Sequence, residues 1–181
     1  MIREVSETLV DVILEATGDL PLGAWVDLHS LSAADADPTA NHLVIALHAV
    51  EEHPHLRNRP LVGTPDGYVR PPLALRLHYV ITYIGDHDEA QSRLDRVVAI
   101  FHTTPIIGRA QLRPALAAQA DSITVRLVTT TPDERNQIWG ALGRSARLAL
   151  FYTVDVAPVD LLTRDGAGTV TAHRIVYVGA P

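Results

Sequence analysis

The sequence contains no cysteine and no lysine, and each absence narrows the chemistry open to the chain. Without cysteine, disulfide bonds and thiolate catalysis are excluded, while the redox compartment stays open. All 15 basic residues are arginines, which favour bidentate ion pairs and interfaces, although a GC-rich genome produces the same bias. No apolar run approaches the roughly 18 residues that a membrane helix needs, so no membrane partner is expected. Residues 1–18 carry acids among their apolar positions and lack a small-residue cleavage site, so they do not resemble a secretory signal.

The remaining composition is that of one globular domain. The chain has 181 residues, of which 47% are hydrophobic and 20% are charged, and this is enough to bury a sizeable core. The net charge of −6 argues against nucleic acid as the main partner, because phosphate binding needs clustered cations.

The stretch from residue 70 to residue 105 organises the expected fold. Apolar side chains recur at every second position over residues 73–83, which predicts a long strand with one buried face. Asp86 and Glu89 then have the spacing of a helix cap and its capping partner. Apolar residues follow at helical spacing until Pro105, which predicts a helix packed back onto the strand.

Similar patterns predict the other elements. Helices are expected at residues 2–16, 109–119 and 132–142, and strands at 24–29, 42–50, 123–127, 148–156 and 170–178. Thr131, Pro132 and Glu134 are typical of a helix start. The two longest strands, at 73–84 and 148–156, are expected to be sheet neighbours. The prediction is a single α+β domain, in which a mixed, mainly antiparallel sheet has helices packed on its faces.

Residues 51–67 are predicted to form a long irregular loop, because they are rich in proline and glycine and too polar for a core. Arg57, Asn58 and Arg59 lie in this loop and are candidate interface residues for an acidic partner surface. The alternative is that the two arginines are simply solvated.

Nine histidines suggest a metal site, but the spacing does not support one. His53 and His55 would share a face of an extended segment, yet no third ligand accompanies them. His48 and His78, expected on neighbouring strands, are interpreted as hydrogen-bonded sheet histidines rather than as a catalytic pair. No nucleophile elbow or phosphate-binding loop is found. The sequence therefore predicts no catalytic, metal-binding or cofactor-binding residues.

Several segments occur in an order and spacing that resemble a known family. They are residues 55–60, 71–79, 84–86, 101–107, 138–143 and 148–152 (HLRNRP, PPLALRLHY, IGD, FHTTPII, IWGALG and LALFY). Together they resemble the N-terminal domain of the tube-terminating cap proteins of extracellular contractile injection systems, which are phage-tail-like particles. The resemblance covers residues 1–162.

The resemblance implies a tail-terminator-like fold and a structural role, with no enzymatic activity and no cofactor. The protein would form a homo-oligomeric ring, a hexamer, on the last ring of the inner tube protein. There it would stop tube polymerisation and tie the tube to the final layer of sheath protein. It would be made in the cytoplasm and assembled into the particle, without nucleic-acid or membrane partners.

The resemblance also divides the chain into a cap domain, residues 1–162, and a C-terminal turn and strand, residues 163–181. Val170, Ile175 and Val176 lie in that strand and are candidate contacts with neighbouring or sheath subunits, because contractile sheaths link subunits by exchanging terminal strands. The alternative is an edge strand of the chain's own sheet.

Two other functions are kept as alternatives. The chain could be a different tail component of the same architecture, such as a completion or baseplate adaptor protein, which would bind elsewhere on the particle. It could instead be a small His-dependent metalloenzyme, which would copurify with a stoichiometric ion.

Overall fold

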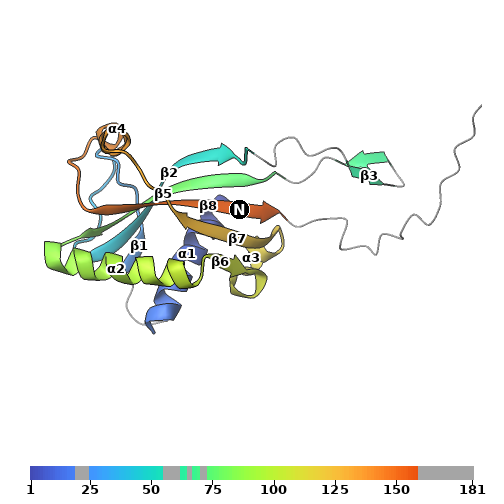
Figure 1. Ribbon diagram of the computed structural model, residues 1–181, viewed down its shortest axis with the longest axis horizontal. Helices are drawn as coiled ribbons and strands as arrows, with labels where there is room; N and C mark the ends of the chain where they lie inside the picture. The colour runs from blue at the N-terminus through green and yellow to red at the C-terminus, as the bar shows by residue number, and fades with distance from the viewer. Residues whose placement is uncertain (19–24, 55–61, 65–66, 70–72, 159–181) are drawn as a thin grey trace, which may run out of the picture.

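The computed structural model describes residues 1–18, 25–54, 62–64, 67–69 and 73–158. These residues form a six-stranded sheet with helices on both faces and a separate two-stranded sheet (Figure 1). The predicted α+β class is confirmed.

The large sheet is mixed but mainly antiparallel, as predicted. Its strands are β1 (Val26–Leu28), β2 (His42–Glu52), β5 (Leu75–Ile84), β8 (Ala149–Pro158), β7 (Ala120–Leu127) and β6 (Ile106–Gly108), in that spatial order. Within it, β1 and β2 are parallel and the other neighbours are antiparallel. The two longest predicted strands are indeed neighbours, because β5 pairs with β8 along their length.

Three helices cover one face of this sheet and a fourth covers part of the other (Figure 1). The first face carries α1 (Ile2–Thr17), α2 (His87–Thr103) and the short α3 (Pro114–Ala117), which follows a 3-10 turn at Arg109–Gln111. The second face carries α4 (Pro132–Leu142). The main core therefore lies between the sheet and the first three helices.

Tyr79 of β5 lies fully buried in this main core. Its hydroxyl and the hydroxyl of Ser6 on α1 are 2.8 Å apart and form a hydrogen bond. Burial raises the pKa of Tyr79 to about 12, and the hydrogen bond to Ser6 opposes that rise. The bond ties the first helix to the central strand without leaving a buried hydroxyl unpaired.

The expectation that residues 73–83 bury one face only is wrong over part of the strand. Val80 and Thr82 point to the second face and are fully buried there, as is Val44 on the neighbouring β2. The reason is that Trp139 of α4 and Leu31 pack with Val44 and Val80 and form a second, smaller core. The alternation of apolar and polar residues in one strand could not predict that a helix far away in the sequence covers the polar face of that strand.

The predicted helix starts are confirmed. Asp86 accepts backbone hydrogen bonds from Asp88 and Glu89 at the beginning of α2. Thr131 and Glu134 form a reciprocal capping box at the beginning of α4. These caps satisfy N–H groups that have no partner inside the helix.

Other boundaries differ from the prediction. β2 continues to Glu52, and the predicted irregular loop contains a strand pair, β3 (Val62–Thr64) with β4 (Gly67–Val69). The short β6 was not predicted, because three residues carry too little pattern. The helix expected over residues 109–119 is a 3-10 turn followed by the short α3, which begins at Pro114 because a first helical position needs no N–H. The strand predicted at 170–178 lies outside the described residues.

Candidate functional site

The interface residues predicted from the sequence are not placed by the structure. Arg57, Asn58 and Arg59, and likewise Val170, Ile175 and Val176, lie outside the described residues. Candidate functional surfaces must therefore be sought on the described part of the sheet.

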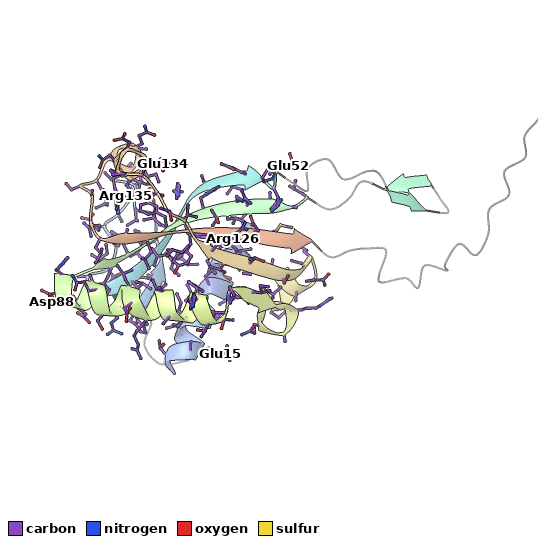
Figure 2. All side chains as sticks on the ribbon, in the orientation of Figure 1. Glu15, Glu52, Asp88, Arg126, Glu134 and Arg135 are labelled. Atoms are coloured by element: carbon purple, nitrogen blue, oxygen red, sulfur yellow. The ribbon has the colours of Figure 1, made fainter. Side chains whose placement is uncertain are left out.

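A polar cluster lies on the second sheet face, beyond the part that packs against α4. The register places Arg76 of β5 opposite Asp155 of β8, and Asp155 opposite Thr124 of β7. Arg126 follows on β7, two residues from Thr124 and on the same face (Figure 2). Asp155 is thus flanked by an arginine from each neighbouring strand.

The Asp155 carboxylate is held by several groups at once. Arg76 donates to it through Nε at 2.7 Å, and Arg126 donates to its other oxygen. His53 Nε2 lies 3.6 Å away. The Asp155 side chain keeps only 14% of its surface exposed, so the carboxylate is enclosed by its partners, whereas the guanidinium of Arg126 remains about half exposed.

The charges around Asp155 decide its ionisation. Partial burial alone would raise the pKa of the Asp155 carboxyl. The hydrogen bond from Arg76, then the charges of Arg126 and Arg76, outweigh burial and hold that pKa below its ordinary value. The group is therefore a permanent anion near neutral pH, which fits an ion-pair anchor and not a proton donor.

Two histidines lie at the border between the polar cluster and the second core. The rings of His48 and His78 are 5.9 Å apart, centroid to centroid, so the two residues do lie on neighbouring strands as predicted. Partial burial, followed by the nearby His78, lowers the pKa of His48. The expectation that both are hydrogen-bonded is wrong for one atom, because His78 Nε2 is buried without a hydrogen bond in the structure, 3.5 Å from a Glu51 oxygen.

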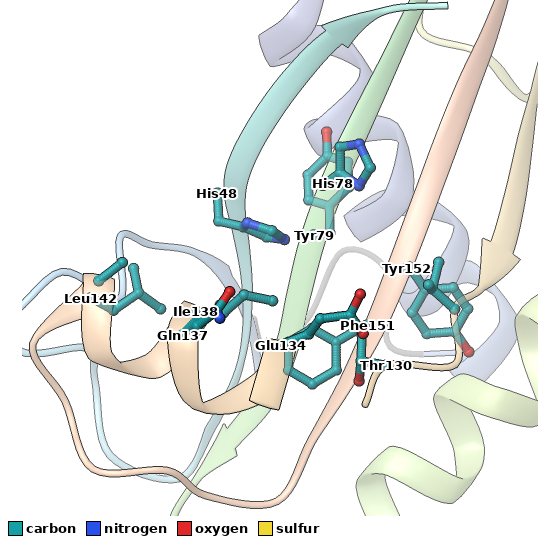
Figure 3. A pocket seen from close by; sticks show the side chains of 12 residues that line it. His48, His78, Tyr79, Thr130, Glu134, Gln137, Ile138, Leu142, Phe151 and Tyr152 are labelled. Carbon is teal, nitrogen blue, oxygen red and sulfur yellow. The ribbon is translucent and has the colours of Figure 1, made fainter. Parts of the chain in front are cut away.

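These histidines also line a hollow of about 590 Å³ between α4 and the sheet (Figure 3). Phe151 from β8 and Ile138 and Leu142 from α4 give it an apolar wall, while Glu134 and Gln137 lie on its α4 side. An open hollow with an apolar wall and polar rim suits the side chain of a protein partner.

The described residues do not assemble a metal centre: no group of three or more His, Asp or Glu side chains is placed to hold an ion. In particular, His53 points to Asp155, and His55 lies outside the described part of the chain. None of the described helices is long and apolar enough to cross a membrane.

Sequence reasoning missed the Asp155 cluster because its members are far apart in the chain. Asp155 is the one charged residue in the apolar alternation of β8, and this is the only local signal. Its partners follow from strand order and register, which the sequence pattern does not determine.

The family model of the Pvc16 N-terminal domain matches residues 4–172. The fold is similar to the PVC sheath/tube terminator of an extracellular contractile injection system in its extended state, with a TM-score of 0.57 and 18% identity, over 100% of this chain and 62% of that chain. The anti-feeding prophage cap, a tube terminating cap, is also similar, with a TM-score of 0.49 and 18% identity, over 93% of this chain and 60% of that chain. No curated protein matches the sequence.

The chain therefore spans less than two thirds of the length of either similar protein. At 18% identity, the likeness to the sheath/tube terminator shows the tail-terminator fold that was expected. The family match extends over most of the sequence and includes every element of the six-stranded sheet. The resemblance found in the sequence is thus confirmed, and the chain belongs to the Pvc16 N-terminal domain family.

Proposed function

We propose that this protein is a structural cap that terminates the inner tube of a contractile injection system and anchors the last sheath layer. The observation that carries the proposal is the family match over residues 4–172, together with a fold like that of a sheath/tube terminator. The protein acts as a homo-oligomeric ring, a hexamer, that contacts the inner tube protein on one side and sheath protein on the other.

The described surfaces support a binding role. The uncovered part of the second sheet face carries an ion-pair network and not a nucleophile beside a base. Exposed apolar side chains, such as Leu127 and Ile106, lie on the two strands at one side of the sheet. We propose further that the protein is not an enzyme and that it is made in the cytoplasm before it joins the particle.

The proposal is tested by electron microscopy of particles from cells that lack the gene, beside the same cells carrying it on a plasmid. We expect naked tubes, missing sheaths or uncontrolled tube lengths in the deletion strain, and restored particles in the complemented strain. Normal particles of normal length in the deletion strain would reject the cap function. Labelled protein found at the opposite end of the tube would favour a completion or baseplate adaptor protein.

A further inference from the structure

The outer edge of β2 is open over half of its length. β1 pairs only with residues Leu43–Ile45 of β2, and the chain then leaves the sheet after Leu28. On its inner side β2 pairs with β5 as far as Glu52. In the described part of the chain, no strand pairs with the outer side of β2 from Ala46 to Glu52.

Main-chain groups of this edge point outward at known positions. Leu43 N–H donates to Trp25 on the outer side, so alternation turns Leu47 N–H outward as well. After the irregularity between Leu47 and Ala49, His53 N–H donates inward to Ala74. The direction of the N–H group alternates along a strand, and Val50 lies three residues before His53. The N–H of Val50 therefore points outward. A strand placed here would find donors and acceptors ready for pairing.

A groove of mixed character lies beside the first part of this edge, on the face that carries α1. It has a volume of about 620 Å³; Ile2, Leu28, Ile45 and Leu47 give it apolar lining, and Arg3, Ser6, Glu7, His29 and Ser30 give it polar lining. Leu47 and Val50 keep 36% and 42% of their surface exposed, although both lie on the same face as the main core. The groove is where β1 would continue if it were longer, so a further strand would cover these side chains.

We propose that this edge of β2 accepts an extended strand formed by residues 170–178 of an adjacent copy of the chain. The segment, VTAHRIVYV, would place Val170, Ala172, Arg174, Val176 and Val178 on one face of a strand, and Arg174 is the one charged residue among these small or apolar side chains. Strand addition would pair the free main-chain groups of β2 and place alternate side chains over the groove.

The position of the chain's last described residues supports this donor. β2 and β8 both run antiparallel to β5, so both end at the same end of the sheet (Figure 1). Residues 159–181 continue from that end. The inference rests on the proposed ring: if each copy accepts residues 170–178 of one neighbour at β2 and gives its own to the other neighbour, all of these head-to-tail contacts are made when the ring closes.

Cysteine cross-linking tests the pairing, because the natural chain has no cysteine. Two full-length chains with different tags are coexpressed, one carrying V50C and the other a single cysteine placed in turn at each of residues 174–178. We expect a disulfide-linked product that contains both tags. The control is L148C, an exposed apolar position away from this edge, which should give none. Absence of the mixed product with V50C, or equal yields with L148C, would overturn the proposal.

A proline substitution tests the same edge without cross-linking. V50P removes an outward N–H that makes no bond to β5, a position at which an edge strand tolerates proline. V50T is the matched control, since it keeps the N–H and a β-branched side chain. We expect the dissociation constant for self-association to rise at least 10-fold in V50P and to stay near the wild-type value in V50T. Equal association of the two variants would contradict strand addition.

The two proposals can fail separately. If V50P restores capped particles to the deletion strain as well as wild type does, strand addition at β2 is wrong and the cap function stands. If the deletion strain makes normal particles, the cap function is wrong, and the V50C cross-links still decide whether copies pair through this edge.

Discussion

At the scale of single residues, Asp155 has the most unusual position in the described structure. It is a charged residue in an apolar strand, yet it is enclosed by arginines from two neighbouring strands. A carboxylate shared by two guanidinium groups stabilises the sheet only while it stays ionised. Its removal leaves two like charges side by side with no anion between them.

We predict that D155N lowers the free energy of unfolding at neutral pH by about 1.5–3 kcal/mol, the range for hydrogen bonds to charged groups. The measurement is urea unfolding at several pH values. D121N is the control, because Asp121 and Arg109 form a half-exposed ion pair whose loss should cost less than about 1 kcal/mol. If the two substitutions lower the free energy of unfolding equally, the enclosure of Asp155 does not strengthen its ion pairs.

The pH dependence of this effect has a definite sign. Because the pKa of Asp155 in the folded protein lies below its ordinary value of 3.8, the unfolded chain takes up the proton first as the pH falls. The stability that Asp155 contributes is therefore complete well above pH 3.8 and is lost as the pH drops through the folded-state pKa. The difference between wild type and D155N should be constant near neutral pH and shrink below about pH 4.

At the scale of elements, α4 is the one described helix that packs on the second face of the sheet. It is short, and Trp139 is its only fully enclosed side chain among the described residues. Its ends are held by the Thr131 capping box and by Gly143, which has φ of +69° at the C-terminus. α4 covers the second core and forms one wall of the histidine-lined hollow. The contacts at its two ends therefore help to maintain that hollow.

We predict that T131A destabilises α4 by about 0.5–2 kcal/mol, the cost of losing a helix cap. Hydrogen exchange should speed up for the amides of α4 and remain slow for those of β5. T131S keeps the hydroxyl that accepts the Glu134 N–H, so its exchange should match wild type. Unchanged exchange in T131A would mean that packing of Trp139 alone holds the helix.

At the scale of the whole molecule, the chain leaves surfaces that an assembly would cover. The outer edge of β2 lies at one side of the sheet, whereas the Asp155 cluster and the hollow beside α4 both lie on its second face. The proposed ring between tube and sheath would need several such surfaces, one for each kind of neighbour. The division into residues 1–162 and 163–181 stays a prediction, as do the loop and tail contacts.

We predict that R57E combined with R59E weakens binding of the protein to the tube or to itself by at least 10-fold. The reason is that an acidic partner surface would then face acidic side chains. Cosedimentation with purified tubes and analytical ultracentrifugation measure the two outcomes. The matched control is R96E combined with R135E, which changes the net charge equally at two exposed helix positions. Unchanged binding in the loop variant would show that both arginines are solvated and do not contact a partner.

The sequence by itself determined the local elements and the family. Period-two and helical patterns, the Asp86 cap and the Thr131 capping box depend on neighbours a few residues away, so each could be inferred without the fold. The motifs in residues 55–152 likewise sufficed to suggest the family that the comparison confirmed.

Only the tertiary structure decided which elements meet. Strand order placed two arginines around Asp155, and a distant helix buried the side of β5 that carries Thr82. The shortness of β1 left the edge of β2 open beside a groove lined by both apolar and polar residues. Each of these features joins residues separated by tens of positions in the chain. Local propensity acts over a few residues, whereas strand pairing and helix packing are chosen by burial over the whole molecule.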